Sequence, residues 1–177
     1  MAIPLRYSNA ANIIANSRTF FVTSSTRDKS NLLQSDRLAR LFVEVLYHYR
    51  GQRKFRLHEF VVMPDHFHVL LTIENDMSIE RAVQFVKGDF AFRAGKEIGI
   101  RAPFWQKGFS EIRVFDTQHY ERIREYIWNN PVKRHLAPQA KDYPYSSARD
   151  EFKLDPPPHR LKPNEFNAFN DMAKAIS

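Results

Sequence analysis

The sequence predicts an α+β fold of the ferredoxin-like βαββαβ kind, with an antiparallel sheet and one additional helix toward the C-terminus. Three observations support this fold class. Strand-like and helix-like segments follow in the order strand, helix, strand, strand, helix, strand, helix, which is the split βαβ arrangement. A chain of 177 residues, 43% hydrophobic, suits one domain with a sizeable core. The proline run at 156–158 is the clearest break, so we expect one domain over residues 1–150 and a tail over residues 151–177.

The first half of the chain predicts three strands and one helix. Residues 20–25 are rich in aromatic and β-branched types, which favours a strand. Ser35 or Asp36 can cap a helix that ends at Gly51. Residues 55–63 and 66–73 predict an antiparallel strand pair joined by a turn at 64–65. The helix's apolar positions recur at helical spacing: Leu38, Leu41, Phe42, Val45, Leu46 and Tyr49.

The second half predicts two helices around one strand. Ser78 caps a helix that runs to about Gly95, and residues 109–115 form the fourth strand after an irregular stretch. The last helix begins at residue 116 or 117 and is expected to end near residue 129 or 130. Pro131 predicts this end, because proline disfavours a helical conformation in the residue before it. In the tail, a short helix is expected over residues 163–175.

Composition and charge point to a nucleic-acid partner in the cytoplasm. No apolar run approaches the roughly 20 residues of a membrane span, and the first residues lack signal-peptide order. Without cysteine, a metal site must use His, Asn, Asp, Glu or Gln, which favours harder divalent ions. The net charge is +7, and the first sixty residues hold ten Lys or Arg against four acids. Such a basic, aromatic-rich chain favours nucleic-acid binding slightly over a merely solvated basic surface.

Two histidines begin the third predicted strand on one face of the sheet. His66 and His68 are two apart, and side chains at i and i+2 of a strand point the same way. The intervening positions, from Phe67 to Ile73, are apolar and must face the core. The histidines then lie on the face that a ferredoxin-like sheet leaves for a ligand or for the last helix. This pattern leaves metal ligands and hydrogen-bonded structural residues both open.

Tyr126 and Asn130 project from the same side of the last predicted helix, because i and i+4 share a face. Taken alone, Tyr126 reads as a packing residue and Asn130 as the residue that ends a helix before Pro131. Together with a nearby histidine pair, they would bring a phenol and an amide to a metal ion. This arrangement predicts metal-assisted attack of a tyrosine on a phosphodiester.

Four segments in this order resemble the REP-associated tyrosine transposases, which belong to the single-tyrosine HUH transposase family (IS200-like). The first two carry Met-Pro-Asp-His-Phe-His and Phe-Trp-Gln-Lys-Gly-Phe, and the third carries Tyr-Ile-Trp-Asn-Asn-Pro. The fourth is an aromatic-Ser-Ser element. The resemblance extends over about residues 19–148. The segments are residues 61–71, 104–109, 126–133 and 143–147.

The resemblance implies a role for each matching residue. His66 and His68 match the metal-binding histidines, Asn130 matches the third metal ligand, and Tyr126 matches the nucleophile. The implied metal is Mg²⁺ or Mn²⁺. The implied reaction leaves a 5′-phosphotyrosine link and a free 3′-OH, which can later rejoin a strand. Asp65 is either a turn residue or a partner that orients a metal-binding histidine.

The resemblance also implies a substrate, single-stranded DNA that folds into a hairpin of the repetitive extragenic palindromic kind. A bacterial, nucleoid-associated location follows from that substrate, and the protein acts as a monomer or a homodimer. If it is a dimer, Tyr126 can serve the partner's metal site. Several basic side chains are candidates to contact the DNA backbone. They are Arg50, Arg53, Lys54, Arg56, Lys87, Lys133 and Arg134.

Two other functions compete with a DNA-nicking and strand-transferring transposase. A non-catalytic nucleic-acid-binding module on a ferredoxin-like sheet predicts exposed aromatic side chains on the central strands, where this chain has histidines. A metal-dependent hydrolase would use water as its nucleophile and leave Tyr126 structural. Replacement of Tyr126 by phenylalanine separates these mechanisms.

Overall fold

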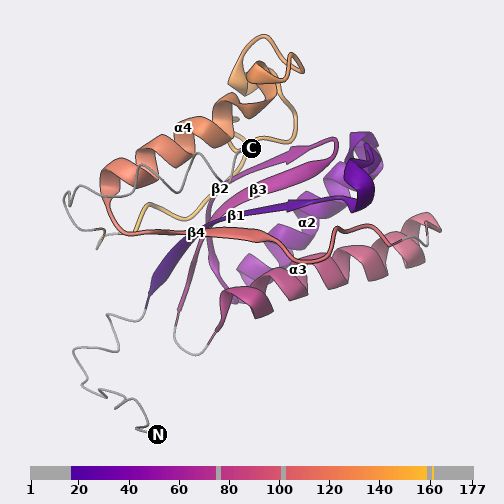
Figure 1. The fold of residues 1–177 in the computed structure, drawn as a ribbon, viewed down its shortest axis with the longest axis horizontal. Coiled ribbons are helices and arrows are strands. Elements are labelled where there is room, and N and C mark those ends of the chain that lie inside the picture. Colours follow the sequence, from indigo (N-terminus) through magenta and orange to yellow (C-terminus); the bar gives the residue numbers. More distant parts are fainter. Residues whose placement is uncertain (1–16, 75–76, 101–102, 159–160, 162–177) are drawn as a thin grey trace, which may run out of the picture.

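The computed structural model describes residues 17–74, 77–100, 103–158 and 161. In this part of the chain, four antiparallel strands form one sheet in the order β2-β3-β1-β4. Helices α2 and α3 cover one face of the sheet and α4 lies across the other (Figure 1). The elements are β1 (Arg18–Ser25), α2 (Asp36–Gly51), β2 (Arg56–Met63), β3 (His66–Ile73), α3 (Ile79–Arg93), β4 (Ser110–Val114) and α4 (Thr117–Lys133).

This architecture confirms the predicted fold class. Each predicted strand and helix of the domain is present in the predicted order, and the strand order is that of a ferredoxin-like sheet. Two short 3₁₀ turns, Arg27–Lys29 and Leu32–Gln34, lie between β1 and α2, and a π-helical turn (Ala94–Ile98) extends α3. No helix in the described residues has the length and apolar character needed to cross a membrane.

Residues 151–158 run along the outer edge of β2. The backbone N–H of Asp155 donates to the carbonyl of Leu57 at 2.9 Å, and Phe152 packs edge-on against Phe60. The division of the chain at residue 150 stays a prediction. The helix expected over residues 163–175 lies outside the described residues.

Strand alternation divides the buried side chains into two cores. Phe67, Val69, Leu71 and Ile73 pack on the side of α2 and α3, as predicted. The second core lies between the sheet and α4, and the histidines of β3 face this side. Its buried members are Phe21, Val61, Met63, Leu70, Val114, Tyr120, Ile123, Ile127 and Tyr143. Because α4 has an apolar side of its own, it covers the histidine face instead of leaving it to solvent.

The predicted end of the last helix was wrong. Helix α4 continues through Pro131 to Lys133. Proline removes only its own N–H donor, and the carbonyl of Asn130 still accepts from the N–H of Arg134 at 3.1 Å, so the final turn keeps its bonds. Asn130 is therefore an interior helical residue, and its buried side chain requires an explanation other than helix termination.

Candidate active site

His66 and His68 follow the turn at residues 64–65 and lie side by side at the start of β3. Both are nearly buried, with 7% and 4% of their surface exposed. Their ring centroids are 4.7 Å apart, and the two Nε2 atoms lie 3.1 Å from each other. The predicted shared face is therefore real, and both rings aim the same nitrogen at one point.

The other nitrogen of each ring is held by a neighbouring side chain. Nδ1 of His66 lies 2.6 Å from Oδ1 of Asp65, and Nδ1 of His68 lies 2.7 Å from Oγ1 of Thr23. A carboxylate only accepts hydrogen bonds here, so Asp65 fixes the proton of His66 on Nδ1 and leaves Nε2 with a lone pair. Asp65 is thus both a turn residue and the partner of a site histidine.

Helix α4 places Asn130 and Tyr126 over the histidine pair. Nδ2 of Asn130 lies 3.2 Å from Nε2 of His68, and its Oδ1 is buried without a hydrogen-bond partner. The two ends of an asparagine amide are interchangeable in such an assignment, so either end can face His68. The Tyr126 ring packs edge-on against His68 at 5.3 Å and against Phe21 at 5.9 Å. All four residues singled out from the sequence therefore meet within one chain.

Burial sets the protonation of these groups. It lowers the pKa of His66, although the Asp65 carboxylate opposes the effect, and it lowers the pKa of His68 further, with help from His66 and Arg134. Both imidazoles are therefore neutral at physiological pH, the form in which histidine binds metals. Burial also raises the pKa of the Tyr126 phenol, against the opposing effects of a hydrogen bond with Asn130 and the charge of Arg134. The phenol keeps its proton at neutral pH.

The ring-nitrogen geometry suits a small divalent ion. With metal–ligand bonds of about 2.1 Å, two nitrogens 3.1 Å apart subtend roughly 95° at the ion, close to adjacent ligands of an octahedron. The described residues contain no group of three or more His, Cys, Asp or Glu that could hold a metal. The buried Oδ1 of Asn130, which has no hydrogen-bond partner, is an oxygen that could serve as a third protein ligand beside the two imidazoles.

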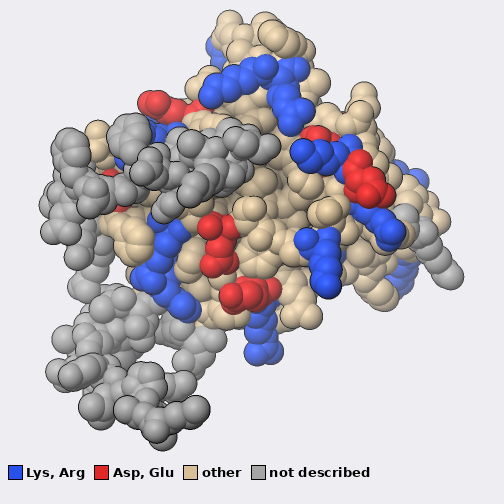
Figure 2. All heavy atoms as spheres, in the orientation of Figure 1, with Lys and Arg blue, Asp and Glu red and all other residues tan. Residues whose placement is uncertain are grey.

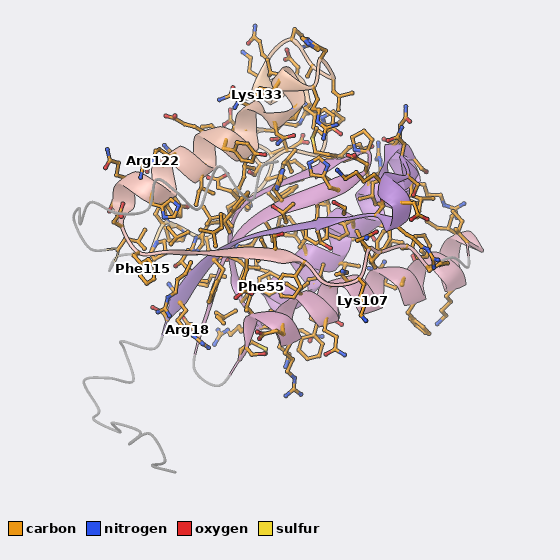
Figure 3. All side chains as sticks on the ribbon, in the orientation of Figure 1. Arg18, Phe55, Lys107, Phe115, Arg122 and Lys133 are labelled. Atoms are coloured by element: carbon orange, nitrogen blue, oxygen red, sulfur yellow. The ribbon has the colours of Figure 1, made fainter. Side chains whose placement is uncertain are left out.

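Two of the predicted DNA-contacting residues, Lys133 and Arg134, flank this cluster. The ammonium of Lys133 lies 5.3 Å from the centre of the Tyr126 ring, and the charge of Arg134 acts on Tyr126 and both histidines. Figure 2 shows lysine and arginine side chains at the top of the molecule, where Figure 3 places Lys133 at the C-terminal end of α4. Lys133 and Arg134 are both exposed, and together they form a basic rim beside the cluster.

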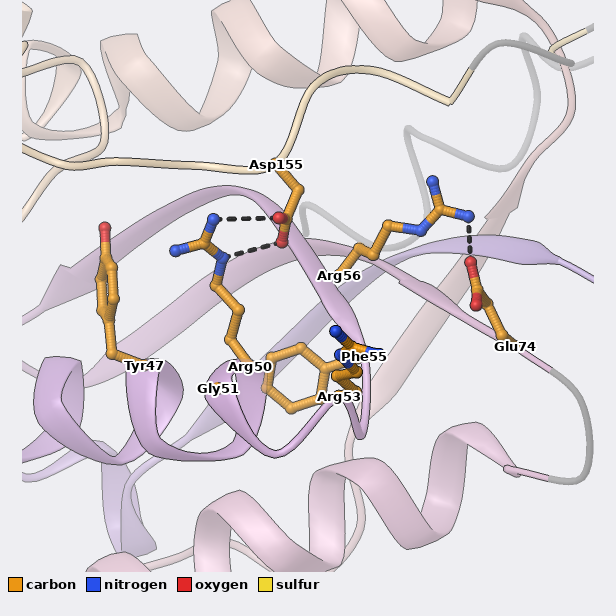
Figure 4. Close-up of a pocket in the computed structure, with 8 residues that line it drawn as sticks. All are labelled: Tyr47, Arg50, Gly51, Arg53, Phe55, Arg56, Glu74 and Asp155. Carbon is orange, nitrogen blue, oxygen red and sulfur yellow. Dashed lines mark hydrogen bonds and ion pairs between the residues drawn. The ribbon is translucent and has the colours of Figure 1, made fainter.

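The basic group at residues 50–56 lies at the other end of the sheet. In the β2–β3 pairing, Arg56 is opposite Thr72, whereas Met63 is opposite His66, a separation of about 20 Å along the strand. Arg50 holds Asp155 with two hydrogen bonds of 2.8 and 2.9 Å, and Arg56 pairs with Glu74 (Figure 4).

The other three basic candidates differ in how they are held. Arg53 is exposed, in the left-handed backbone region. Lys54 lies over the Phe85 ring at 5.7 Å. Lys87 donates to the carbonyls of Gln106 and Gly108 at 3.1 and 2.7 Å, which fastens the loop before β4 to α3.

Two residues near the site, Thr23 and Lys29, were not predicted from the sequence. Thr23 became visible only through the β1–β3 register, which places it directly opposite His68. Lys29 has a charge that acts on His66, and it belongs to the 3₁₀ turn after β1. Neither lies in a motif, so only the register and the turn geometry reveal them.

Comparison with known proteins agrees with this geometry. The family model "Transposase IS200 like" matches residues 17–130, close to two thirds of the chain. The REP-associated tyrosine transposase of Escherichia coli K12 is 28% identical over 133 residues, which cover 73% of this chain and 75% of that protein. A solved REP-associated tyrosine transposase bound to a REP hairpin superposes with a TM-score of 0.61 at 25% identity, covering 96% of both chains.

A solved putative transposase from Deinococcus radiodurans shares the fold, with a TM-score of 0.50 at 21% identity over 73% of this chain and 97% of that one. The family expected from the four sequence segments is confirmed, because its model spans the strands, the histidine pair and α4 up to Asn130. The chain belongs to the IS200-like transposase family and is a DNA-cleaving enzyme of the transposase class.

Proposed function

We propose that this protein cleaves and rejoins single-stranded DNA carrying a hairpin of the REP kind, and that Tyr126 is the nucleophile. One observation carries the proposal. The Tyr126 ring and the Asn130 amide, whose Oδ1 has no hydrogen-bond partner, lie beside the two imidazoles, whose Nε2 atoms are 3.1 Å apart. The hairpin substrate is inferred from the related transposase solved with a REP hairpin.

His66, His68 and Asn130 are proposed to hold Mg²⁺ or Mn²⁺. The neutral imidazoles, the 3.1 Å spacing of their Nε2 atoms and the orphaned Oδ1 of Asn130 all suit such an ion. When bound, the ion would neutralise charge on the scissile phosphate and orient it for in-line attack. Asp65 and Thr23 hold the two rings so that the lone pairs stay directed at that point.

The Tyr126 oxygen would form a bond to phosphorus while the bond from phosphorus to the 3′ oxygen breaks. The phenolic proton leaves to solvent, and the departing 3′ oxygen takes up a proton to become a 3′-OH. The positive charge of Arg134 favours the phenolate, and Asn130 stabilises it by hydrogen bonding. The 5′-phosphotyrosine link retains the bond energy, so the reverse attack by a 3′-OH rejoins a strand without another energy source.

Lys133, Arg134 and Lys29 surround the site with positive charge and are proposed to hold phosphates beside the cleaved bond. The exposed Arg53 and neighbouring Lys54 are proposed to contact a more distant part of the hairpin. Because all four site groups come from one chain, we infer that a monomer is sufficient for catalysis.

The test uses a labelled single strand with a REP-type hairpin, Mn²⁺ and a denaturing gel. Wild type is expected to form a covalent adduct with the DNA fragment whose 5′ phosphate lies at the cut, and Tyr126→Phe is expected to abolish both adduct and cut. Persistence of the cut in Tyr126→Phe would instead indicate a hydrolase that uses water. DNA binding without any metal-dependent cut would indicate a non-catalytic binding module.

A further inference from the structure

A buried carboxylate lies beneath α4 and has no part in the proposed chemistry. Glu59 of β2 is only 6% exposed. The β2–β3 pairing shifts between Leu57 and Glu59, so one extra residue, His58, is accommodated in β2. As a result, two successive residues face α4. His58 packs against the Tyr120 ring at 5.9 Å, and Glu59 accepts a hydrogen bond from the helix.

Glu59 joins three separate parts of the chain through one oxygen. Its Oε2 accepts from the indole N–H of Trp128 on α4 at 2.8 Å and from the hydroxyl of Ser147 at 2.6 Å. The Ser147 oxygen in turn accepts from the N–H of Phe60 at 2.9 Å. The bond that Ser147 accepts from β2 leaves its one hydroxyl proton free, and this proton is donated to Glu59.

The aromatic-Ser-Ser element at residues 143–147, which carries Ser147, is itself fixed against β2. The Tyr143 hydroxyl donates to the Val62 carbonyl at 2.9 Å, and the Val62 N–H donates to the Tyr145 carbonyl at the same distance. Ser146 pairs with Val61, and the Ser147 N–H donates to the Phe60 carbonyl at 2.9 Å. The segment therefore lies along the free edge of β2 as a short added strand and cannot slide without breaking these bonds.

Stability alone is a weak explanation for Glu59. Burial raises its pKa, even though the Ser147 and Trp128 hydrogen bonds and the Arg124 charge oppose the shift. An apolar residue here would avoid the desolvation cost, and Ile123 and Ile127 already attach α4 to the sheet by packing. Apolar packing lets a helix rotate or slide, whereas a directional hydrogen bond specifies one orientation.

The position of Trp128 makes that orientation relevant to the site. It lies two residues after Tyr126 and two before Asn130, about 3 Å along the helix axis from each. Because these side chains belong to one helix, a rotation of α4 that moves Trp128 away from Glu59 also moves the phenol and the amide relative to His68.

We infer that Glu59, fixed by Ser147, is a positioning residue whose bond to Trp128 sets the rotation and height of α4 over the histidine pair. The inference rests on the proposed function for its effect on catalysis. Its structural part, the anchoring of α4, can be measured without any reaction.

The experiment compares wild type with Glu59→Ala, Glu59→Gln and Trp128→Phe in the full chain. Single-turnover cleavage of saturating hairpin DNA gives the rate of the chemical step, and a separate titration gives the DNA Kd. Hydrogen exchange of the α4 peptide over residues 117–133, against that of α2 over residues 36–51, reports anchoring. Glu125→Gln is the matched control, since it alters an exposed carboxyl on the same helix.

Glu59→Ala is expected to slow cleavage by about 10- to 100-fold, as a misplacement of about 1 Å does, and to speed exchange in α4 selectively. The DNA Kd is expected to change by less than about threefold, because the basic rim is intact. Glu59→Gln keeps an oxygen acceptor for both donors and is expected to restore the rate to within about threefold of wild type. Trp128→Phe removes the N–H donor while keeping an aromatic ring, and it is expected to behave like Glu59→Ala, which keeps the test valid if the alanine variant does not fold.

Three results would contradict either the positioning role of Glu59 or the proposed function. An unchanged rate and unchanged α4 exchange in Glu59→Ala and Trp128→Phe would overturn the positioning role. Equal losses in Glu59→Gln and Glu59→Ala would also overturn it, because charge rather than orientation would then matter. If wild type does not cleave although α4 exchange rises in both variants, the proposed function fails while the anchor stands.

Discussion

The contact between Asp65 and His66 makes a quantitative prediction about metal affinity. Nδ1 and Oδ1 are 2.6 Å apart, and the two side chains are only 9% and 15% exposed, so solvent screens the pair weakly. Asp65→Ala removes the acceptor that keeps the His66 proton on Nδ1. The ring is then free to place its proton on Nε2, where it would block the proposed ligand position.

Loss of such an outer partner typically weakens a metal site by about 10- to 100-fold, equivalent to roughly 1.4–2.7 kcal/mol of binding free energy. Calorimetric titration with Mn²⁺ is expected to show this loss in Asp65→Ala. Asp65→Asn retains an oxygen acceptor without the charge, so its affinity is expected to fall between that of wild type and the alanine variant. Nitrogen chemical shifts of the His66 ring would report the tautomer directly.

The control separates the histidine partner from the turn. Pro64→Ala changes the other residue of the same turn and is expected to leave the Mn²⁺ affinity within about threefold of wild type. If Asp65→Ala binds Mn²⁺ as tightly as wild type with the His66 proton still on Nδ1, the reasoning is refuted. Absence of Mn²⁺ binding by the wild type would refute the metal site itself.

Three further predictions follow from described contacts. Asn130→Ala removes the proposed amide ligand and is expected to weaken Mn²⁺ binding by at least about tenfold, whereas the exposed neighbour change Asn129→Ala is not. In a titration at several salt concentrations, Lys133→Ala with Arg134→Ala is expected to flatten the salt dependence of single-strand binding by about 0.7 per residue; an unchanged slope would place the phosphates elsewhere. Because burial lowers the pKa of His119, the unfolded chain protonates it near its ordinary value and the folded chain only below that value. The free energy of unfolding by urea should therefore fall as pH drops below about 6.5, by at most about 1.4 kcal/mol per pH unit for this residue, and His119→Phe should reduce that fall.

Local patterns were sufficient to predict the elements and the central residues of the site. Alternation along β3 correctly separated the apolar face from the histidine face, since side-chain direction in a strand depends only on position. Helical spacing correctly placed Tyr126 and Asn130 on one side of α4. The sequence could not show that α4 would lie across the histidines, because that depends on packing between residues far apart in the chain.

The failures have equally physical causes. Pro131 was expected to end α4, but a proline close to a helix end costs few hydrogen bonds, so buried packing outweighed its local preference. The basic residues at 50–56 and Lys133 were both named as candidates for DNA contact, and that role stays a prediction; the sequence did not show that the length of β2 separates the two groups. Charge composition carries no information about distance in the fold. The partners of the histidines, such as Thr23, required the strand register.

The division of the proposed metal ligands between β3 and α4 has a thermodynamic consequence. Two of the proposed ligands belong to the sheet and the third, Asn130, lies on α4, 62 residues after His68, so the complete site exists only while α4 is docked. If docking of α4 raises the affinity for the ion by some factor, then by thermodynamic linkage binding of the ion raises the docking equilibrium constant by the same factor. A tenfold preference corresponds to about 1.4 kcal/mol in either direction. Divalent-ion affinity would therefore serve as a measure of how firmly the helix that carries the nucleophile is seated.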